Sequence, residues 1–188
     1  KRADNEGFGV VYGDTDSVFL LLDRKTKQDA LNFMDEVNKT LPGMMELEFE
    51  GYFPRGIFVA IKGTDKGAKK KYALIREDGS TKITGFESVR RNWSLLAKEA
   101  QQEVLRMVLR DNVSGALVYV KNKVGELREG KIEIEKLIMK TQLTREIDKY
   151  TSIGPHVLVA KKMVQKGEKV SPGVIIPYVI AKGIGLVR

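Results

Sequence analysis

The stretch Val10-Val11-Tyr12-Gly13-Asp14-Thr15-Asp16-Ser17-Val18-Phe19 decides how the first part of this chain folds. Two short apolar runs, 8–12 and 18–22, are separated by the polar residues 13–17. This pattern predicts a tight antiparallel β-hairpin whose turn contains both aspartates. Because both arms are strongly apolar, we expect the hairpin to be buried on both of its faces.

Asp14 and Asp16 are the residues of this hairpin that can carry chemistry. Carboxylates two residues apart in extended chain can point to the same side. Two acids pressed together at a buried tip repel each other and lose hydration, so they stay ionised only if a cation joins them. Mg²⁺ prefers carboxylate oxygens, and two such ions can bind the attacking and leaving oxygens of a phosphoryl transfer. Ordinary turn chemistry is the alternative, because Gly, Asp, Thr and Ser also favour turns that bind nothing.

The residues that follow predict a small antiparallel sheet with one helix. Apolar residues recur at helical spacing over 28–41, with Thr26 as a candidate N-cap. Alternation over 45–49 predicts a half-buried strand, and the apolar runs 57–61 and 72–75 predict two more.

After Gly85 the pattern becomes mainly helical. Apolar stripes predict helices over 89–108 and 114–128, and a third helix begins at Pro155 and ends near 167. The run 174–180 predicts a strand, which Pro177 should confine to a sheet edge. We therefore expect an α+β fold with two domains, 1–84 and 85–188.

Composition excludes several classes of protein. The 188 residues include no cysteine and one histidine, His156, which excludes a disulfide scaffold, a thiolate metal site and a histidine-rich metal site. No apolar run approaches the roughly 20 residues that a membrane-spanning helix needs.

The net charge of +8 belongs entirely to the second predicted domain. Residues 1–84 contain 14 basic and 14 acidic residues, whereas residues 85–188 contain 19 basic and 11 acidic residues. Such asymmetry suggests that the second domain faces a polyanion. A lysine-rich solvated surface is the alternative.

Residues 12–17, with their apolar flanks, closely resemble motif C of family B (replicative, α-like) DNA polymerases. Residues 69–72 resemble that family's lysine-lysine-arginine-tyrosine motif, and 47–53 resemble the palm strand between the two motifs. Residues 85–94 resemble the start of the thumb. Further thumb motifs are matched by 154–161 and 172–175. The resemblance thus implies a C-terminal part of the palm over 1–84 and a mainly helical thumb over 85–188. The loop 63–68 departs from the pattern as an insertion, which loosens the expected placement of Lys69.

The resemblance implies a role for each matching residue. Asp16 is expected to be a principal ligand of two Mg²⁺ ions, with Asp14 as its close acidic neighbour, and both are expected to be catalytic. Residues expected to shape the hairpin are Tyr12, Gly13 and Thr15. Residues expected to hold the primer strand or the duplex phosphates are Lys70, Lys71, Tyr72, Arg90, Arg91, Lys161 and Lys162. Glu48 and Glu50 either approach the metals or form the solvated face of their strand.

The resemblance covers only the C-terminal part of such a polymerase. Motif A with the other essential aspartate, the fingers and the exonuclease are missing, so the two ions should be shared with that aspartate and this chain alone should be inactive. The expected partners are a larger chain carrying those parts, primer-template DNA and deoxynucleoside triphosphates, in the cytoplasm with the chromosome and away from any membrane. The chain resembles the small subunit of a naturally split archaeal polymerase, and a fragment of one continuous chain is the alternative.

Two other functions stay open at this point. A non-catalytic duplex-DNA-binding subunit or clamp could retain the palm and thumb shape, but it would be expected to lose an acidic motif residue. A basic structural protein with a lysine-rich surface would show no metal dependence.

Overall fold

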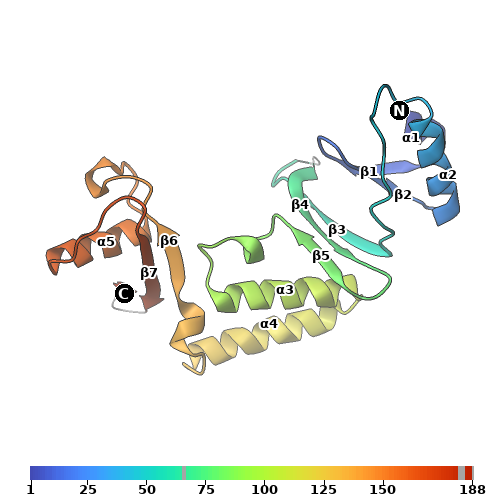
Figure 1. Cartoon of the computed structure of the whole chain (residues 1–188). Coiled ribbons are helices and arrows are strands. Elements are labelled where there is room, and N and C mark those ends of the chain that lie inside the picture. The colour runs from blue at the N-terminus through green and yellow to red at the C-terminus, as the bar shows by residue number, and fades with distance from the viewer. Residues whose placement is uncertain (65–66, 182–184, 188) are drawn as a thin grey trace. The chain divides into compact units, whose positions relative to one another are not determined.

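The computed structural model describes residues 1–64, 67–181 and 185–187. The chain divides into two compact units, Lys1–Gly85 and Phe86–Arg188, called unit 1 and unit 2 below. Both units combine helices with small antiparallel sheets, so the predicted α+β class is confirmed (Figure 1).

Unit 1 begins with the short helix α1 (Arg2–Asn5) and the predicted hairpin, formed by β1 (Gly9–Gly13) and β2 (Val18–Leu21). The strands pair antiparallel, with Gly13 opposite Val18 and a bulge between Val10 and Tyr12. The hairpin exists as predicted, but the prediction that both faces are buried is wrong. The side chains of Val10, Val11, Val18 and Leu21 are 44–56% exposed. The sheet also has only two strands in the described chain.

Helix α2 (Lys27–Asn38) follows the hairpin and has the predicted N-cap. The Thr26 hydroxyl accepts a hydrogen bond from the Asp29 amide at 3.2 Å, and the Asp29 carboxylate accepts one from the Thr26 amide at 2.7 Å. This reciprocal pair is a capping box, which satisfies two backbone donors at the helix start. The helix ends at Asn38, three residues before the predicted end.

The predicted strand over 45–49 is wrong. No strand forms there, and the Asn38 side chain binds this segment instead. Its amide nitrogen donates to the Leu47 carbonyl at 3.0 Å, while its oxygen accepts from the Leu47 amide at 2.8 Å. One side chain therefore satisfies both backbone groups of Leu47 that a neighbouring strand would otherwise have paired.

The second sheet of unit 1 contains β3 (Arg55–Ala60), β4 (Gly67–Ile75) and β5 (Thr81–Thr84) in that order. Strand β4 is central: Tyr72 lies opposite Phe58 of β3 and Thr84 of β5. The register shifts between Phe58 and Ala60, so β4 bulges as it passes the lysines. Strand β4 begins five residues earlier than predicted, and β5 was not predicted.

Unit 2 begins with a 3₁₀-helix, η1 (Glu87–Val89), and two long helices, α3 (Leu95–Leu109) and α4 (Val113–Arg128). The helices pack side by side as a hairpin (Figure 1). The predicted helix over 89–108 starts too early, because the Ser94 hydroxyl caps α3 by accepting from the Ala97 amide at 3.3 Å. Val89 and Trp93 therefore precede the helix.

The main core of unit 2 lies between α5 (Pro155–Gln165) and the sheet of β6 (Met139–Gln142), β7 (Ile175–Ala181) and β8 (Gly185–Val187). Residues buried together in this core are Leu143, Val157, Val159, Ala160, Met163, Ile176 and Tyr178. The 3₁₀-helices η2 (Ile134–Leu137) and η3 (Ile147–Lys149) flank β6 in sequence. Strand β7 is central, so its assignment to a sheet edge is wrong. Pro177 is nevertheless tolerated in this strand. It lies opposite Lys140 of β6, whereas β8 pairs only with Val179–Ala181 and so needs no amide from Pro177.

Candidate functional site at the acidic hairpin

An aromatic cluster holds the acidic hairpin against the lysine-containing strand β4. The ring of Tyr12, which is 8% exposed, lies 5.9 Å from Phe19, 5.7 Å from Phe58 and 5.6 Å from Tyr72, measured between centroids. Phe19 also lies 5.2 Å from Tyr72 and 6.3 Å from Phe53. Such pairs add to the stability that burial of the rings provides. The cluster therefore fixes the hairpin tip beside the lysines, although the two sheets share no backbone pairing.

The Tyr12 hydroxyl links three parts of the site. It accepts a hydrogen bond from the backbone amide of Lys70 at 2.6 Å, and it lies 3.5 Å from Asp14 Oδ2, to which it donates. The Lys70 ammonium lies 3.7 Å from the same carboxylate oxygen. Tyr12 thus connects the hairpin to a residue 58 positions away in sequence, and its hairpin-shaping role stays a prediction.

Asp14 is held as a carboxylate by its surroundings. The Thr15 amide donates to Oδ1 at 2.9 Å, the Thr15 hydroxyl approaches the same oxygen at 3.3 Å, and the side chain of Asp14 is only 16% exposed. The hydrogen bond from the Thr15 amide, together with the positive charges of Lys70 and Lys69, holds the pKa of Asp14 below its usual value. The Asp14 amide donates to the Ser17 carbonyl at 2.9 Å and closes the turn.

Asp16 has the opposite character, since it lies exposed at the tip of the turn. Its carboxylate makes no hydrogen bond or ion pair with the residues that the structure describes. Carboxylate oxygens fit Mg²⁺ chemically, but the ion usually needs about six oxygens. Within the described chain no group of three or more Asp, Glu, His or Cys side chains could hold a metal ion. The hairpin therefore fits part of a magnesium site and needs further ligands from outside these residues.

Lys70 has an unusual backbone. Its φ of 56° lies in the left-handed region, which residues other than glycine rarely adopt. Gly85, at the end of β5, packs directly on the Lys70 peptide, and a side-chain carbon added at Gly85 would overlap the Lys70 carbonyl oxygen. The Lys70 side chain itself is 71% exposed apart from its approach to Asp14. Lys71 and Tyr72 are half-buried, and Tyr72 belongs to the aromatic cluster.

The two candidate glutamates do not join the aspartates. Glu50 forms an ion pair with Lys82 of β5, which lies opposite Leu74 in the sheet. Glu48 is exposed on a segment that is not a strand. Neither glutamate belongs to a potential ligand group within the described residues. The approach of either glutamate to the metals stays a prediction, and the strand on which the solvated-face alternative depended does not form.

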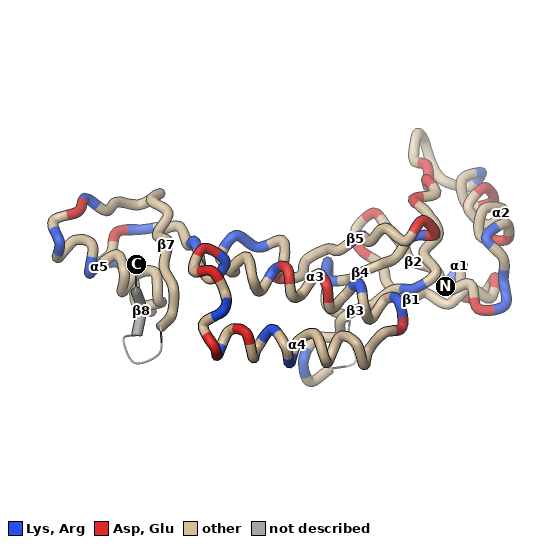
Figure 2. Tube along the Cα trace, turned by 90° about the horizontal axis from the view of Figure 1, so that it is seen from below, with Lys and Arg blue, Asp and Glu red and all other residues tan. Residues whose placement is uncertain are grey.

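The candidate DNA-binding residues of unit 2 lie on two different elements. Arg90 and Arg91 follow η1, are exposed, and form no ion pair within the part of the chain that the structure describes. Lys161 and Lys162 are exposed on α5. Figure 2 shows the Lys and Arg residues of this unit distributed along its helices with acidic residues between them. The positive charge of unit 2 is therefore spread over its elements.

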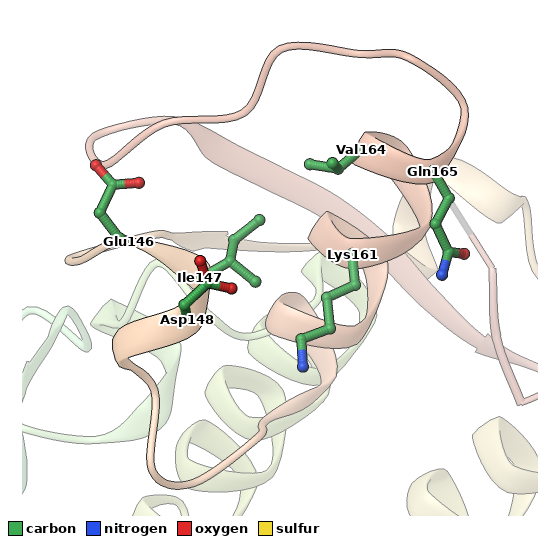
Figure 3. Close-up of a pocket in the computed structure, with 6 residues that line it drawn as sticks. All are labelled: Glu146, Ile147, Asp148, Lys161, Val164 and Gln165. Carbon is green, nitrogen blue, oxygen red and sulfur yellow. The ribbon is translucent and has the colours of Figure 1, made fainter.

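Lys161 also borders a shallow hollow of about 370 Å³. Figure 3 shows Lys161, Val164 and Gln165 on α5, with Glu146, Ile147 and Asp148 on the segment that includes η3. The two carboxylates lower the local positive potential beside Lys161. None of the residues that line this hollow belongs to the hairpin or to β4, so the hollow shares no residue with the acidic site.

Sequence reasoning missed two contributors to the acidic site, the contact of Gly85 with Lys70 and the ring of Phe58. A glycine directly between a strand and a helical segment was the available signal for Gly85. Nothing in the pattern of 57–61 distinguished Phe58 from its apolar neighbours. No described helix has the length and apolar character needed to cross a membrane.

Comparison with known proteins identifies the class to which this fold and site belong. The family model for DNA polymerase family B matches residues 1–185. The chain belongs to DNA polymerase family B.

Individual relatives agree with this assignment. The chain is 41% identical over 191 residues to a DNA polymerase of Pyrococcus horikoshii, covering 98% of this chain and 15% of the relative. It is 42% identical over 189 residues to a DNA polymerase of Methanocaldococcus jannaschii, covering 97% of this chain and 11% of the relative. The solved family B DNA polymerase of Pyrobaculum calidifontis matches 96% of this chain and 22% of its own, with a TM-score of 0.69 and 31% identity. The chain thus spans less than a quarter of the length of each of these relatives.

Proposed function

We propose that this chain supplies the C-terminal part of the palm (unit 1) and the thumb (unit 2) of a DNA-directed DNA polymerase. In the reaction, the primer 3′-hydroxyl attacks the α-phosphate of a deoxynucleoside triphosphate, a new phosphodiester bond forms and pyrophosphate leaves. Membership of family B supports this proposal. The single observation that carries it is the difference between the two carboxylates of the hairpin. The Asp14 carboxylate is bound by Thr15 and Lys70, whereas the Asp16 carboxylate is exposed at the tip and available to a metal ion.

Asp16 would hold Mg²⁺ together with an aspartate from a segment outside this chain, and Asp14 would be its acidic neighbour. When bound, two such ions stabilise the charge that develops on the attacking and leaving oxygens. Asp14 closes the turn through its amide, which donates to the Ser17 carbonyl, and its carboxylate keeps Lys70 close to the tip. The hydrogen bond from the Thr15 amide lowers the pKa of Asp14 and so favours the carboxylate form that attracts Lys70.

Lys70, Lys71 and Tyr72 would hold the primer strand near its 3′ end. The exposed ammonium of Lys70 is available to a phosphate or a base edge beside the acidic tip. Tyr72 would act mainly through its place in the aromatic cluster, which sets the distance between β4 and the hairpin.

Unit 2 would bind the duplex through its phosphates. Arg90 and Arg91 are exposed and form no ion pair with described residues, so they are the stronger candidates. Lys162 remains a candidate on α5, and Lys161 is a weaker one because Glu146 and Asp148 share its hollow.

The open face of the hairpin would be covered by the polypeptide that carries the missing motif. Exposed apolar residues on both strands, Val10, Val11, Val18 and Leu21, form a surface of the kind that marks protein contacts. A larger subunit or another part of a continuous chain would each satisfy this requirement. Without the aspartate of that motif, the chain alone is expected to be inactive.

Substitution of Asp16 by Asn in the assembled polymerase tests the function. Asp16→Asn should bind primed DNA almost as tightly as the wild type and lose nucleotide addition, by about 1,000-fold or more, because charge stabilisation in the transition state is lost. Asp35→Asn, on the exposed face of α2, is the matched control and should change neither quantity. Continued synthesis by Asp16→Asn would contradict the catalytic role and favour a non-catalytic DNA-binding subunit.

A further inference from the structure

We infer that Gly85 is a positioning residue for the proposed polymerase reaction, because it fixes the left-handed backbone of Lys70 that directs this lysine to the acidic hairpin. The inference rests on the proposed function and assigns a role to a residue that directly follows β5 and packs on the backbone of Lys70.

The Lys70 peptide is held from two sides. On one side its amide donates to the Tyr12 hydroxyl at 2.6 Å. On the other side Gly85 packs on its carbonyl so closely that any side-chain carbon at position 85 would overlap the oxygen. Residues held in rarely populated backbone regions persist only where their surroundings fix them, and such residues cluster at functional sites.

The direction of the Lys70 side chain depends on this backbone. With φ at 56°, Lys70 departs from the alternation of a regular strand, and its ammonium lies 3.7 Å from Asp14 Oδ2. A return of Lys70 to extended backbone would change the direction of its Cβ and move the ammonium away from the hairpin tip. Through Lys70, Gly85 therefore helps to set the position of the primer 3′ end relative to Asp16.

Two separate features of position 85, its backbone conformation and its contact with Lys70, require glycine there. Gly85 has a φ of 69°, which by itself favours glycine. Gly43 has a φ of 65° but has no atom within 4 Å of the position that a Cβ would occupy. Comparison of alanine at these two positions separates the contact with Lys70 from the cost of the backbone conformation alone.

The test measures single-turnover extension of a primer by the assembled polymerase carrying Gly85→Ala or Gly43→Ala. A merely structural defect lowers the amplitude of the first turnover, which counts active enzyme. A positioning defect lowers the rate for each active enzyme. We expect Gly85→Ala to lose about 100-fold in this rate, the loss that a misplacement of about 1 Å can cause, with unchanged affinity for the nucleotide. Gly43→Ala should keep the wild-type rate.

Two further measurements make the inference specific. Gly85→Ala should extend matched and mismatched primer ends with less discrimination than the wild type. In a Lys70→Ala background, Gly85→Ala should cause no further loss of rate, because its effect passes through Lys70. If too little Gly85→Ala folds, Tyr12→Phe loosens the backbone of Lys70 on its amide side and should lower the same discrimination.

The inference is overturned if the rate and discrimination of Gly85→Ala match those of Gly43→Ala, or if the losses from Lys70→Ala and Gly85→Ala add fully. The inference is also overturned if Tyr12→Phe discriminates between matched and mismatched primer ends as well as the wild type does. Failure of the wild-type assembly to extend any primer would instead contradict the proposed function.

Discussion

The hydroxyl of Tyr12 accepts a hydrogen bond from the backbone amide of Lys70 at 2.6 Å, and this contact joins the acidic hairpin to the lysine strand. The two residues belong to motifs separated by 58 positions in the chain. Because the same hydroxyl also reaches Asp14, the turn and the strand are coupled through one side chain.

Removal of this hydroxyl should weaken the chain. Tyr12→Phe leaves the Lys70 amide without its partner in a partly buried place, at a cost of about 1–2 kcal/mol in the free energy of unfolding. Urea unfolding of the purified chain measures this loss. Tyr52→Phe is a suitable control, because Tyr52 forms no hydrogen bond within the described residues, and its unfolding midpoint should stay at the wild-type value.

The capping box of α2 offers a second test of the fold. Thr26→Ala removes the hydroxyl that accepts from the Asp29 amide and should cost about 1 kcal/mol of stability. Thr26→Ser retains a hydroxyl and should recover most of the loss. An unfolding midpoint for Thr26→Ala equal to that of Thr26→Ser would show that the capping box contributes little.

Arg90 and Arg91 should determine part of the salt dependence of DNA binding. If each contacts one phosphate, Arg90→Gln or Arg91→Gln should reduce the slope of log affinity against log salt concentration by about 1. Fluorescence anisotropy of primed duplex, measured over a series of salt concentrations, gives this slope. Lys27→Gln removes a positive charge that pairs with Glu77 in unit 1 and should leave the slope almost unchanged.

His156 should make the stability of unit 2 dependent on pH. Burial lowers the pKa of His156, whose ring packs edge-on against Tyr150 at 5.8 Å. The unfolded chain takes up a proton near the ordinary pKa of about 6.5, whereas the folded chain resists protonation until a lower pH. Stability contributed by neutral His156 is therefore present above this pKa and decreases as the pH falls below it.

His156→Phe keeps an aromatic ring against Tyr150 but cannot titrate. The change in unfolding midpoint between about pH 7.5 and about pH 5.5 should be smaller in this variant than in the wild type. An equal change in both proteins would assign the pH dependence to the carboxylates.

Local signals predicted the parts of this fold that neighbouring residues determine. Thr26 with Asp29 gives α2 its start, Pro155 gives α5 its start, and the alternation of apolar and polar runs gives the hairpin. The strand predicted over 45–49 failed for a different reason: its alternation is real, but a strand needs a partner, and Asn38 occupies the backbone of Leu47.

The site was predictable only in its components. Asp14, Asp16 and Lys70 can be found in the sequence, but their different environments depend on packing between distant residues. Thr15, Tyr12 and Lys70 together supply the hydrogen-bond and ionic partners of the Asp14 carboxylate. The Asp16 carboxylate has no such partner among the described residues. The contact of Gly85 with Lys70 joins two positions with no pattern in common, so no periodicity could reveal it.

The two-stranded hairpin also affects how this chain behaves when it is produced alone. Both outer edges of β1 and β2 lack a neighbouring strand in the described chain, and apolar side chains accompany them. Exposed strand edges of this kind can pair with strands of other molecules and lead to aggregation. When this chain is made by itself, these open edges should therefore drive it into aggregates, which light scattering of the purified chain would detect.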